Sequence, residues 1–138
     1  HVAIYNAGVN PVRLTFLGCG YITRVHSRNL RSLARDFQCS YASRDLSKAE
    51  AFKRQYQGLA AYGSYEAAIA SDQTDAVVVA VPPKYHLELT LAALAAGKHV
   101  VVEKPAFLTM ADYQTALAAR NAAGRVVIVG ENDHYKPL

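Results

Sequence analysis

The chain has 138 residues, which predicts a single domain, and a domain of this size buries about two-thirds of the surface that its unfolded chain exposes. Hydrophobic residues make up 51% and charged residues 19%, which excludes an intrinsically disordered chain, and no apolar run approaches the roughly 20 residues of a membrane-spanning helix. The 15 basic residues only slightly exceed the 11 acidic ones and form no long run, so neither a nucleic-acid nor a membrane partner is expected.

The first half of the chain alternates strand-like and helix-like patterns after residues 1–11, an N-terminal arm that has no strong pattern. β-Branched and apolar runs predict strands, whereas apolar residues at helical spacing predict helices. Strands are expected at residues 12–17, 37–42 and 59–62, and helices at residues 22–33, 46–57 and 64–70. Gly58 is expected to end the second helix in the left-handed conformation, and Ser64 to cap the third helix.

The second half repeats this alternation with more continuous apolar runs. Strands are expected at residues 76–81, 99–102 and 125–129, and helices at residues 87–95 and 109–123. Valine-rich runs of this kind are typical of strands that are buried on both faces of a parallel sheet. Thr109 and Asp112 have the spacing of a helix-capping box, and Gly124 is expected to close that helix.

Six strand patterns that alternate with five helix patterns predict an α/β domain over residues 12–138, with a doubly wound, mostly parallel sheet. Right-handed crossovers favour the strand order 3-2-1-4-5-6 of a Rossmann fold. After the sixth strand, residues 131–138 show no element that would end the domain. We therefore expect the chain to be cut from a longer protein.

A glycine-rich turn, GCGYIT, joins the first predicted strand to the first helix. Glycine permits both the sharp turn and the close approach of a pyrophosphate, which the unpaired N–H groups at the helix start can bind. We therefore predict that Gly18, Gly20, Tyr21 and Ile22 contact a dinucleotide. Thr23 replaces the third glycine of the usual fingerprint, which weakens the match, and a tight turn without a ligand is the alternative interpretation.

The end of the second predicted strand decides which dinucleotide is preferred. An acidic side chain there would bind the adenosine ribose and repel a 2′-phosphate, but this sequence has Ser43 and Arg44, followed by Asp45. A hydroxyl beside a guanidinium suits a phosphate, because arginine can bind it with parallel donors or stack on adenine. We therefore expect NADP as the cofactor and NAD as the second choice. The alternative for Arg44 is a surface charge paired with Asp45.

The two cysteines, Cys19 and Cys39, are too few for a disulfide scaffold and are not spaced as a metal-binding pair. We therefore expect no metal site, and we favour a reducing compartment, the cytoplasm. Cys19 lies inside the glycine-rich turn, but no base adjoins it, so we interpret it as a small side chain and not as a nucleophile.

Three polar clusters follow the fourth, fifth and sixth predicted strands, at the carboxyl edge where open α/β sheets bind ligands. Their sequences are VPPKYH at residues 81–86, EKP at residues 103–105 and ENDHY at residues 131–135.

Two longer stretches that contain these clusters resemble a known family. DAVVVAVPP, GKHVVVEKP and His86 are similar to the N-terminal half of the glucose-fructose oxidoreductase, inositol dehydrogenase and rhizopine catabolism (Gfo/Idh/MocA) family, and the resemblance covers residues 12–137. It implies a nicotinamide dinucleotide cofactor and hydride transfer to or from a sugar, polyol or related hydroxyl compound. It also implies a C-terminal substrate domain, which is absent from this sequence.

In that family the lysine of the Glu-Lys-Pro triplet lies by the nicotinamide and the substrate. The resemblance thus implies that Lys104 is catalytic and helps to move the proton that accompanies the hydride. Glu103 would lie near the nicotinamide ribose or orient Lys104, and Pro105 would hold a fixed bend that can be cis. For His86 a structural or cofactor-contact role is favoured over a catalytic one. The cofactor contacts implied at this edge are Val81, Pro82, His86, Glu103, Lys104 and Asn132. For Lys104 the alternative is an ordinary surface lysine.

We therefore predict the nucleotide-binding half of an NADP-dependent oxidoreductase, which binds cofactor with little or no turnover alone and forms a homo-oligomer at full length. The alternative is a regulatory Rossmann domain that senses a nucleotide without chemistry, since such modules can be this long as complete domains. The Glu-Lys-Pro triplet argues against a sensor, which has no evident need for Lys104 at a hydride-transfer edge.

Overall fold

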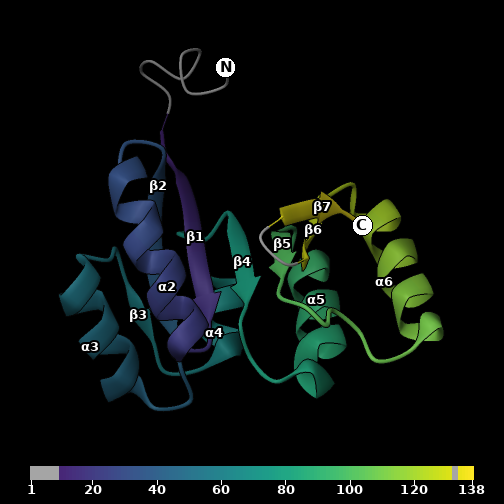
Figure 1. Ribbon diagram of the computed structural model, residues 1–138, viewed down its shortest axis with the longest axis horizontal. Helices are drawn as coiled ribbons and strands as arrows, with labels where there is room; N and C mark the ends of the chain where they lie inside the picture. Colours follow the sequence, from purple (N-terminus) through teal and green to yellow (C-terminus); the bar gives the residue numbers. More distant parts are fainter. Residues whose placement is uncertain (1–9, 132–133) are drawn as a thin grey trace.

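The computed structural model describes residues 10–131 and 134–138, in which strands and helices alternate along the chain (Figure 1). The strands are β1 (Val12–Leu17), β2 (Phe37–Ala42), β3 (Ala61–Tyr62), β4 (Ala76–Val79), β5 (His99–Val102), β6 (Val127–Glu131) and β7 (His134–Pro137). The α-helices are α2 (Tyr21–Leu30), α3 (Leu46–Tyr56), α4 (Tyr65–Ala70), α5 (His86–Ala95) and α6 (Met110–Ala123), and short 3-10 helices occupy Arg31–Leu33 and Pro83–Tyr85. Most of the expected N-terminal arm, residues 1–9, lies outside the described residues.

The strands form one sheet with the order β3-β2-β1-β4-β5-β6-β7. Strands β1 to β6 run parallel to their neighbours, which confirms the predicted doubly wound Rossmann sheet and its strand order 3-2-1-4-5-6. β7 adds to β6 in the antiparallel direction, with Tyr135 opposite Gly130. The expectation that residues 131–138 hold no further element is therefore wrong, because a short polar edge strand lacks the apolar run that marks a buried one.

The ends of the helices follow from a few local side chains. The hydroxyl groups of Ser64 and Thr109 accept hydrogen bonds from the backbone N–H groups in the first turns of α4 and α6, both at 3.1 Å, as predicted. Gly124 ends α6 with a φ of 64°, also as predicted. The prediction for Gly58 is wrong, because Gln57 takes the left-handed conformation instead, with a φ of 55°. Within the described ranges, no helix is both long and apolar enough to cross a membrane.

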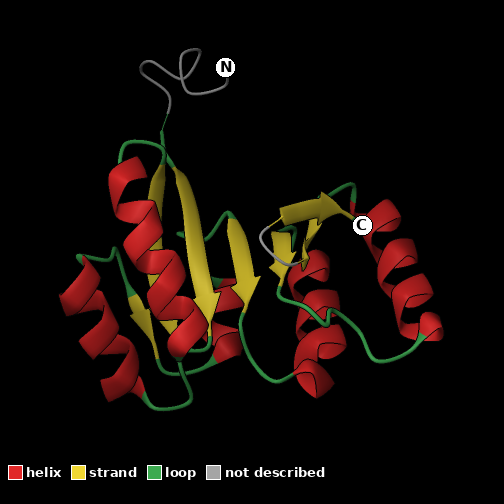
Figure 2. Ribbon diagram, in the orientation of Figure 1, coloured by secondary structure: helices red, strands yellow, loops and turns green. Residues whose placement is uncertain are grey.

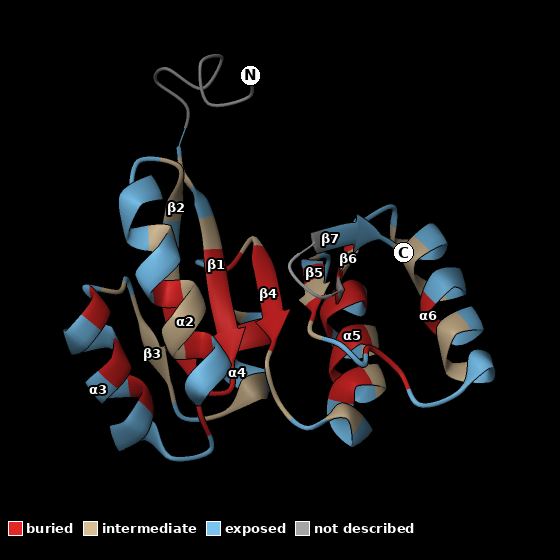
Figure 3. Ribbon diagram, in the orientation of Figure 1, coloured by how far each residue is buried: buried red, intermediate tan, exposed pale blue. Residues whose placement is uncertain are grey.

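Helices lie on both faces of the sheet and enclose a core on each (Figures 2 and 3). On one face, α2 and α3 cover an aromatic core in which the Tyr41 ring lies 5.7 Å from the rings of both Phe16 and Phe52. On the other face, α4, α5 and α6 cover alternate valines of β4 and β5, which pack with Leu94 and Ala116 in one cluster: Val77, Val79, Val100 and Val102. Removing this apolar surface from water is the main term that favours folding.

The sheet is only partly covered on the α2 side, because none of the described helices lies over β5 and β6 there. A groove of about 600 Å³ is open on this side and is lined mainly by strand side chains such as Val78, Val101 and Ile128. His26 of α2 and Tyr135 of β7 also line it. The groove therefore exposes one face of β4, β5 and β6, and on β5 it reaches from His99 to Val101.

Two polar links fix the start of β4 against its neighbouring strands. The backbone N–H and the guanidinium of Arg13 donate to the Asp75 carboxylate over distances of 2.8 to 3.1 Å. These hydrogen bonds lower the pKa of Asp75. On the other side, the ammonium of Lys98 donates to the carbonyl oxygens of Ser71 and Thr74, both at 2.7 Å. The links hold β4 in register with β1 and β5, so the carboxyl ends of the three strands lie together.

Candidate functional site

The turn after β1 has the geometry of a phosphate-binding loop. Gly18 has a φ of 113°, and a Cβ there would lie 2.5 Å from the carbonyl oxygen of Ala80, so only glycine fits without a shift of the backbone. Gly20 precedes α2, and a Cβ there would meet nothing within 4 Å. No side chain caps the start of α2, so its first N–H groups face this open space. This arrangement permits close approach of an anion to the positive end of the helix dipole.

Thr23, which replaces the third glycine of the usual fingerprint, is accommodated next to the turn. Its side chain is fully buried, and its hydroxyl donates to the carbonyl oxygen of Gly18 at 2.5 Å. The threonine therefore bonds back to the turn from a buried position at the start of α2. Tyr21 and Ile22, in contrast, are exposed to 76% and 41%. Their predicted cofactor contacts would thus come from the backbone at the helix start, and their side chains do not line the cleft described next.

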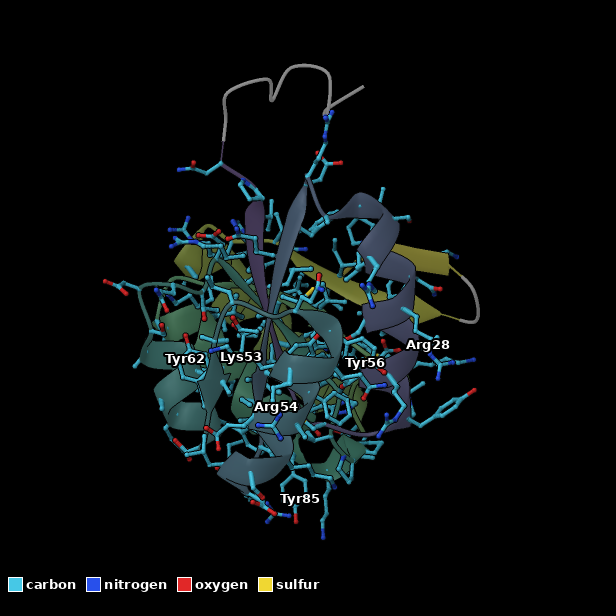
Figure 4. All side chains as sticks on the ribbon, turned by 90° about the vertical axis from the view of Figure 1, so that its left-hand side faces the viewer. Arg28, Lys53, Arg54, Tyr56, Tyr62 and Tyr85 are labelled. Atoms are coloured by element: carbon cyan, nitrogen blue, oxygen red, sulfur yellow. The ribbon has the colours of Figure 1, made fainter. Side chains whose placement is uncertain are left out.

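The glycine-rich turn opens into a cleft of about 940 Å³ at the carboxyl ends of β1, β2 and β4. Six residues predicted from the sequence line it: Gly18, Gly20, Ser43, Arg44, Val81 and Pro82. Lys48 and Tyr65 also line it and were not predicted. A smaller pocket of about 160 Å³ continues past Arg44 towards Tyr85, which marks this end of the molecule in Figure 4.

The charges at the rim of the cleft favour an anionic ligand. Asp45 caps α3 through hydrogen bonds from the backbone N–H and the hydroxyl of Ser47, at 3.0 and 2.6 Å, and these bonds lower its pKa. Both bonds go to the Oδ1 atom of Asp45, which also lines the cleft. The expected alternative, a pair between Arg44 and Asp45, is not among the ion pairs of the described residues. Arg44 and Lys48 are both exposed on the cleft side. Two cations beside a helix N-terminus can bind phosphate groups.

The Cys19 side chain lies under the turn and is buried. Its thiol lies 3.5 Å from the carbonyl oxygen of Ala42, and burial raises its pKa to about 11, an effect that Lys48 partly opposes. The thiol is therefore protonated at neutral pH, which agrees with its interpretation as a small side chain.

His86 connects two of the predicted polar clusters. Its ring is 1% exposed, and its Nδ1 and Nε2 atoms lie 2.7 and 2.6 Å from the carbonyl oxygens of Ala106 and Val81. Both ring nitrogens thus face backbone groups of the protein, so the imidazole holds the end of β4 against the loop that follows β5. The prediction for His86 was a structural or cofactor-contact role, and the contacts described here are of the structural kind.

The Glu-Lys-Pro triplet follows β5, away from the glycine-rich cleft. Lys104 and Pro105 are exposed, and the peptide bond between them is cis. The Glu103 carboxylate lies against His26, which was not predicted, and Tyr135, which was predicted only as part of a polar cluster. Nε2 of His26 is 2.5 Å from Oε1 of Glu103, and the Tyr135 hydroxyl is 3.5 Å from the same oxygen. Asn132, which was also predicted, lies outside the described residues.

The site therefore has two parts along one edge of the sheet, a cleft for an anionic nucleotide and a cluster of polar groups after β5. No local pattern marks His26, which lies in α2, 77 residues before Glu103. Among the described residues, no group of three or more histidine, cysteine, aspartate or glutamate side chains could hold a metal ion.

Comparison with known proteins identifies relatives of this chain. A family model described as "Oxidoreductase family, NAD-binding Rossmann fold" (Gfo/Idh/MocA) matches residues 12–131. Among curated relatives, a dTDP-3,4-didehydro-2,6-dideoxy-alpha-D-glucose 3-reductase of Saccharopolyspora spinosa is 35% identical over 88% of this chain and 36% of its own length. A D-xylose 1-dehydrogenase (NADP(+)) of Haloferax volcanii is 43% identical over 54% of this chain and 22% of its own length.

The fold is shared with solved structures of similar proteins. A 3-ketoreductase from Actinomadura kijaniata, in complex with TDP-benzene and NADP in an open conformation, superposes with a TM-score of 0.82 and 30% sequence identity. The superposition covers 87% of this chain but only 38% of that protein. The chain thus spans little more than a third of the length of such relatives.

Proposed function

This chain belongs to the Gfo/Idh/MocA oxidoreductase family, and we propose that it is the NADP-binding half of an enzyme that oxidises or reduces a sugar, a polyol or a related hydroxyl compound. The observation that carries this proposal is the cleft of about 940 Å³ between the glycine-rich turn and Arg44. The open space at Gly20 admits a pyrophosphate to the N-terminus of α2, and the rest of the cleft suits the adenosine half of a dinucleotide.

The preference for NADP over NAD rests on the end of β2. Asp45, the carboxylate that lines the cleft there, is partly occupied, because its Oδ1 atom caps α3. Arg44 and Lys48 instead bring two positive charges to the rim, which suits a 2′-phosphate. The relatives that are solved or named with NADP, from Actinomadura kijaniata and Haloferax volcanii, support this preference.

Lys104 is the proposed catalytic residue. When bound, the nicotinamide accepts or donates the hydride, and a proton must move at the substrate oxygen at the same time. An ammonium at the exposed end of β5 can stabilise the developing alkoxide or exchange that proton. The contacts of His86 with the loops after β4 and β5 give the backbone near Lys104 a defined path.

The experiment that tests this proposal is a titration of the chain with NADPH and with NADH, followed by the fluorescence of the reduced nicotinamide and by calorimetry. We expect saturable binding of both, with the tighter binding for NADPH. Absence of binding of either dinucleotide at millimolar concentration would overturn the proposed function. Tighter binding of NADH would overturn the cofactor preference alone.

A further inference from the structure

Three polar side chains from three different elements meet where β5 ends. His26 comes from α2, Glu103 follows β5, and Tyr135 lies in β7. Nε2 of His26 lies 2.5 Å from Oε1 of Glu103, and the Tyr135 hydroxyl lies 3.0 Å from the same ring nitrogen and 3.5 Å from the same carboxylate oxygen. The side chains of His26 and Glu103 are 24% and 19% exposed, so their contact is largely shielded from water.

The short distance between His26 and Glu103 implies that a proton lies between the two atoms and forms a hydrogen bond. A carboxylate oxygen and a bare ring nitrogen are both acceptors and would repel each other at 2.5 Å, so a proton lies between them. When Nε2 carries that proton, it cannot also accept one from Tyr135. The Tyr135 hydroxyl then donates towards Glu103, and burial together with the Glu103 charge raises the pKa of Tyr135 to about 12, which keeps this donor protonated. Both groups thus act on the Oε1 atom of Glu103.

Neighbouring groups restrict the His26 ring and the Glu103 carboxylate. The His26 ring is stacked on Phe16, with ring centroids 6.3 Å apart and an interplanar angle of 20°. Gly130 lies behind the carboxylate, where a Cβ would be 3.1 Å from both Oε2 of Glu103 and Cε1 of Tyr135. The absence of a side chain at Gly130 therefore lets the tyrosine ring and the carboxylate lie side by side.

We propose that His26 and Tyr135 are positioning residues that hold the Glu103 carboxylate ready to accept hydrogen bonds from the ribose on the nicotinamide side of the dinucleotide. This inference rests on the proposed function, because a dinucleotide that extends from the glycine-rich cleft would bring that ribose to the end of β5. A carboxylate held in place before the ligand arrives loses less freedom on binding than a mobile one, so the two positioning residues contribute to affinity without touching the ligand.

The test compares two ligands on the same variants of this chain. NADPH contains the nicotinamide riboside, whereas adenosine 2′,5′-bisphosphate contains only the adenosine half and does not reach Glu103. We expect His26→Ala and Tyr135→Phe to weaken NADPH binding, by about 5- to 10-fold for the histidine, and to leave the affinity for the bisphosphate unchanged. His26→Gln, which restores an N–H donor, should recover part of the loss. His99→Ala, at the opposite end of β5, is the matched control and should change neither affinity.

Several outcomes would overturn the inference. Equal losses for both ligands would mean that the cluster serves only the stability of the fold, and unchanged NADPH affinity in both variants would mean that Glu103 needs no support. Tyr135→Phe keeps the ring beside Gly130, so it remains informative if His26→Ala does not fold.

The ¹⁵N signals of the His26 ring give a ligand-free check, because Nε2 should carry a proton that Glu103→Gln perturbs. If the wild-type chain binds the bisphosphate but not NADPH, the proposed function fails, and this inference fails with it.

Discussion

Arg44 is the side chain on which the choice between the two dinucleotides depends, because it is exposed at the rim of the cleft while Asp45 is engaged in capping α3. Arg44→Asp replaces a phosphate-binding cation by an acceptor for ribose hydroxyl groups. We expect the affinity for NADPH to fall about 10- to 100-fold and the affinity for NADH to be kept or improved, as measured by calorimetry.

The matched control for this variant is Arg28→Asp, since Arg28 is an exposed arginine of α2 outside the cleft (Figure 4). It makes the same change of charge and should leave the ratio of the two affinities unaltered. An unaltered ratio in Arg44→Asp itself would remove Arg44 from the cofactor site.

Gly18 and Gly20 should respond differently to the same substitution. In Gly18→Ala the new Cβ meets the Ala80 carbonyl oxygen at 2.5 Å in a left-handed conformation, so we expect a loss of about 1–3 kcal/mol in the free energy of unfolding. In Gly20→Ala the Cβ enters open space, so stability should be nearly unchanged while NADPH binding weakens, because the methyl group occupies the approach of the pyrophosphate. Urea unfolding and NADPH titration separate the two effects. A Gly20→Ala variant that binds NADPH as the wild type does would contradict this assignment.

Some residues of the site could be predicted, because the local sequence alone determines where they lie in the fold. Gly18, Gly20 and Arg44 directly follow predicted strands, and a parallel sheet brings the ends of such strands to one edge. His26 could not be predicted, and Tyr135 was placed only in a polar cluster without a role, because their contact joins α2, β5 and an edge strand that has no apolar signal. Lys48 and Tyr65 lie in helices whose orientation over the cleft is likewise a property of the packed structure.

At the scale of the elements, apolar runs and caps predicted most of the fold. β1, β2 and β5 have the predicted bounds, whereas β4 ends at Val79, two residues before the predicted end of that strand. β3 is only two residues long, and β7 was missed, since both lie at edges where burial is incomplete. The end of α3 was also misassigned: Gly58 is needed for packing, as a Cβ there would lie 2.9 Å from the ring of Tyr41, and Gln57 makes the turn instead.

The link between β1 and β4 makes the stability of the fold depend on pH. The Arg13 side chain and backbone hold the pKa of Asp75 below its ordinary value, so the folded state gains stability from the charged carboxylate at neutral pH. This contribution is lost as the pH falls from about 5 towards 2, because Asp75 then takes up a proton more readily in the unfolded chain. The side chains are 37% and 39% exposed, so solvent screening keeps the effect modest.

Asp75→Asn should therefore lower the free energy of unfolding at neutral pH and reduce its loss on acidification, as measured by urea unfolding across this range. Glu50→Gln, which removes an exposed carboxylate from α3, should retain the pH dependence of the wild type. A pH dependence in Asp75→Asn equal to that of the wild type would show that the link contributes nothing.

At the scale of the whole molecule, the chain should bind a dinucleotide without catalysing its reduction. The chain spans 36% and 22% of the length of the two curated relatives compared above, and a hydride-transfer site must also hold the substrate carbon against the nicotinamide and exclude water. We expect NADPH to raise the melting temperature with ligand concentration, as binding to the folded state alone requires. With NADP and D-xylose or myo-inositol, no reduced cofactor should form, as followed by absorbance. Measurable turnover would place a complete active site within these residues.

The unequal edges of the sheet have a consequence for the behaviour of the chain in concentrated solution. An exposed edge strand offers unpaired N–H and C=O groups to which other chains can add, and long flat edges promote aggregation. Here one edge is β3, with only two residues, and the other is β7, which contains Lys136 and Pro137. A two-residue strand gives a short template, while a charge and a proline, which has no N–H to donate, discourage pairing at the other edge. The valine-rich strands β4 and β5, which would aggregate most readily, are thus kept in the interior of the sheet.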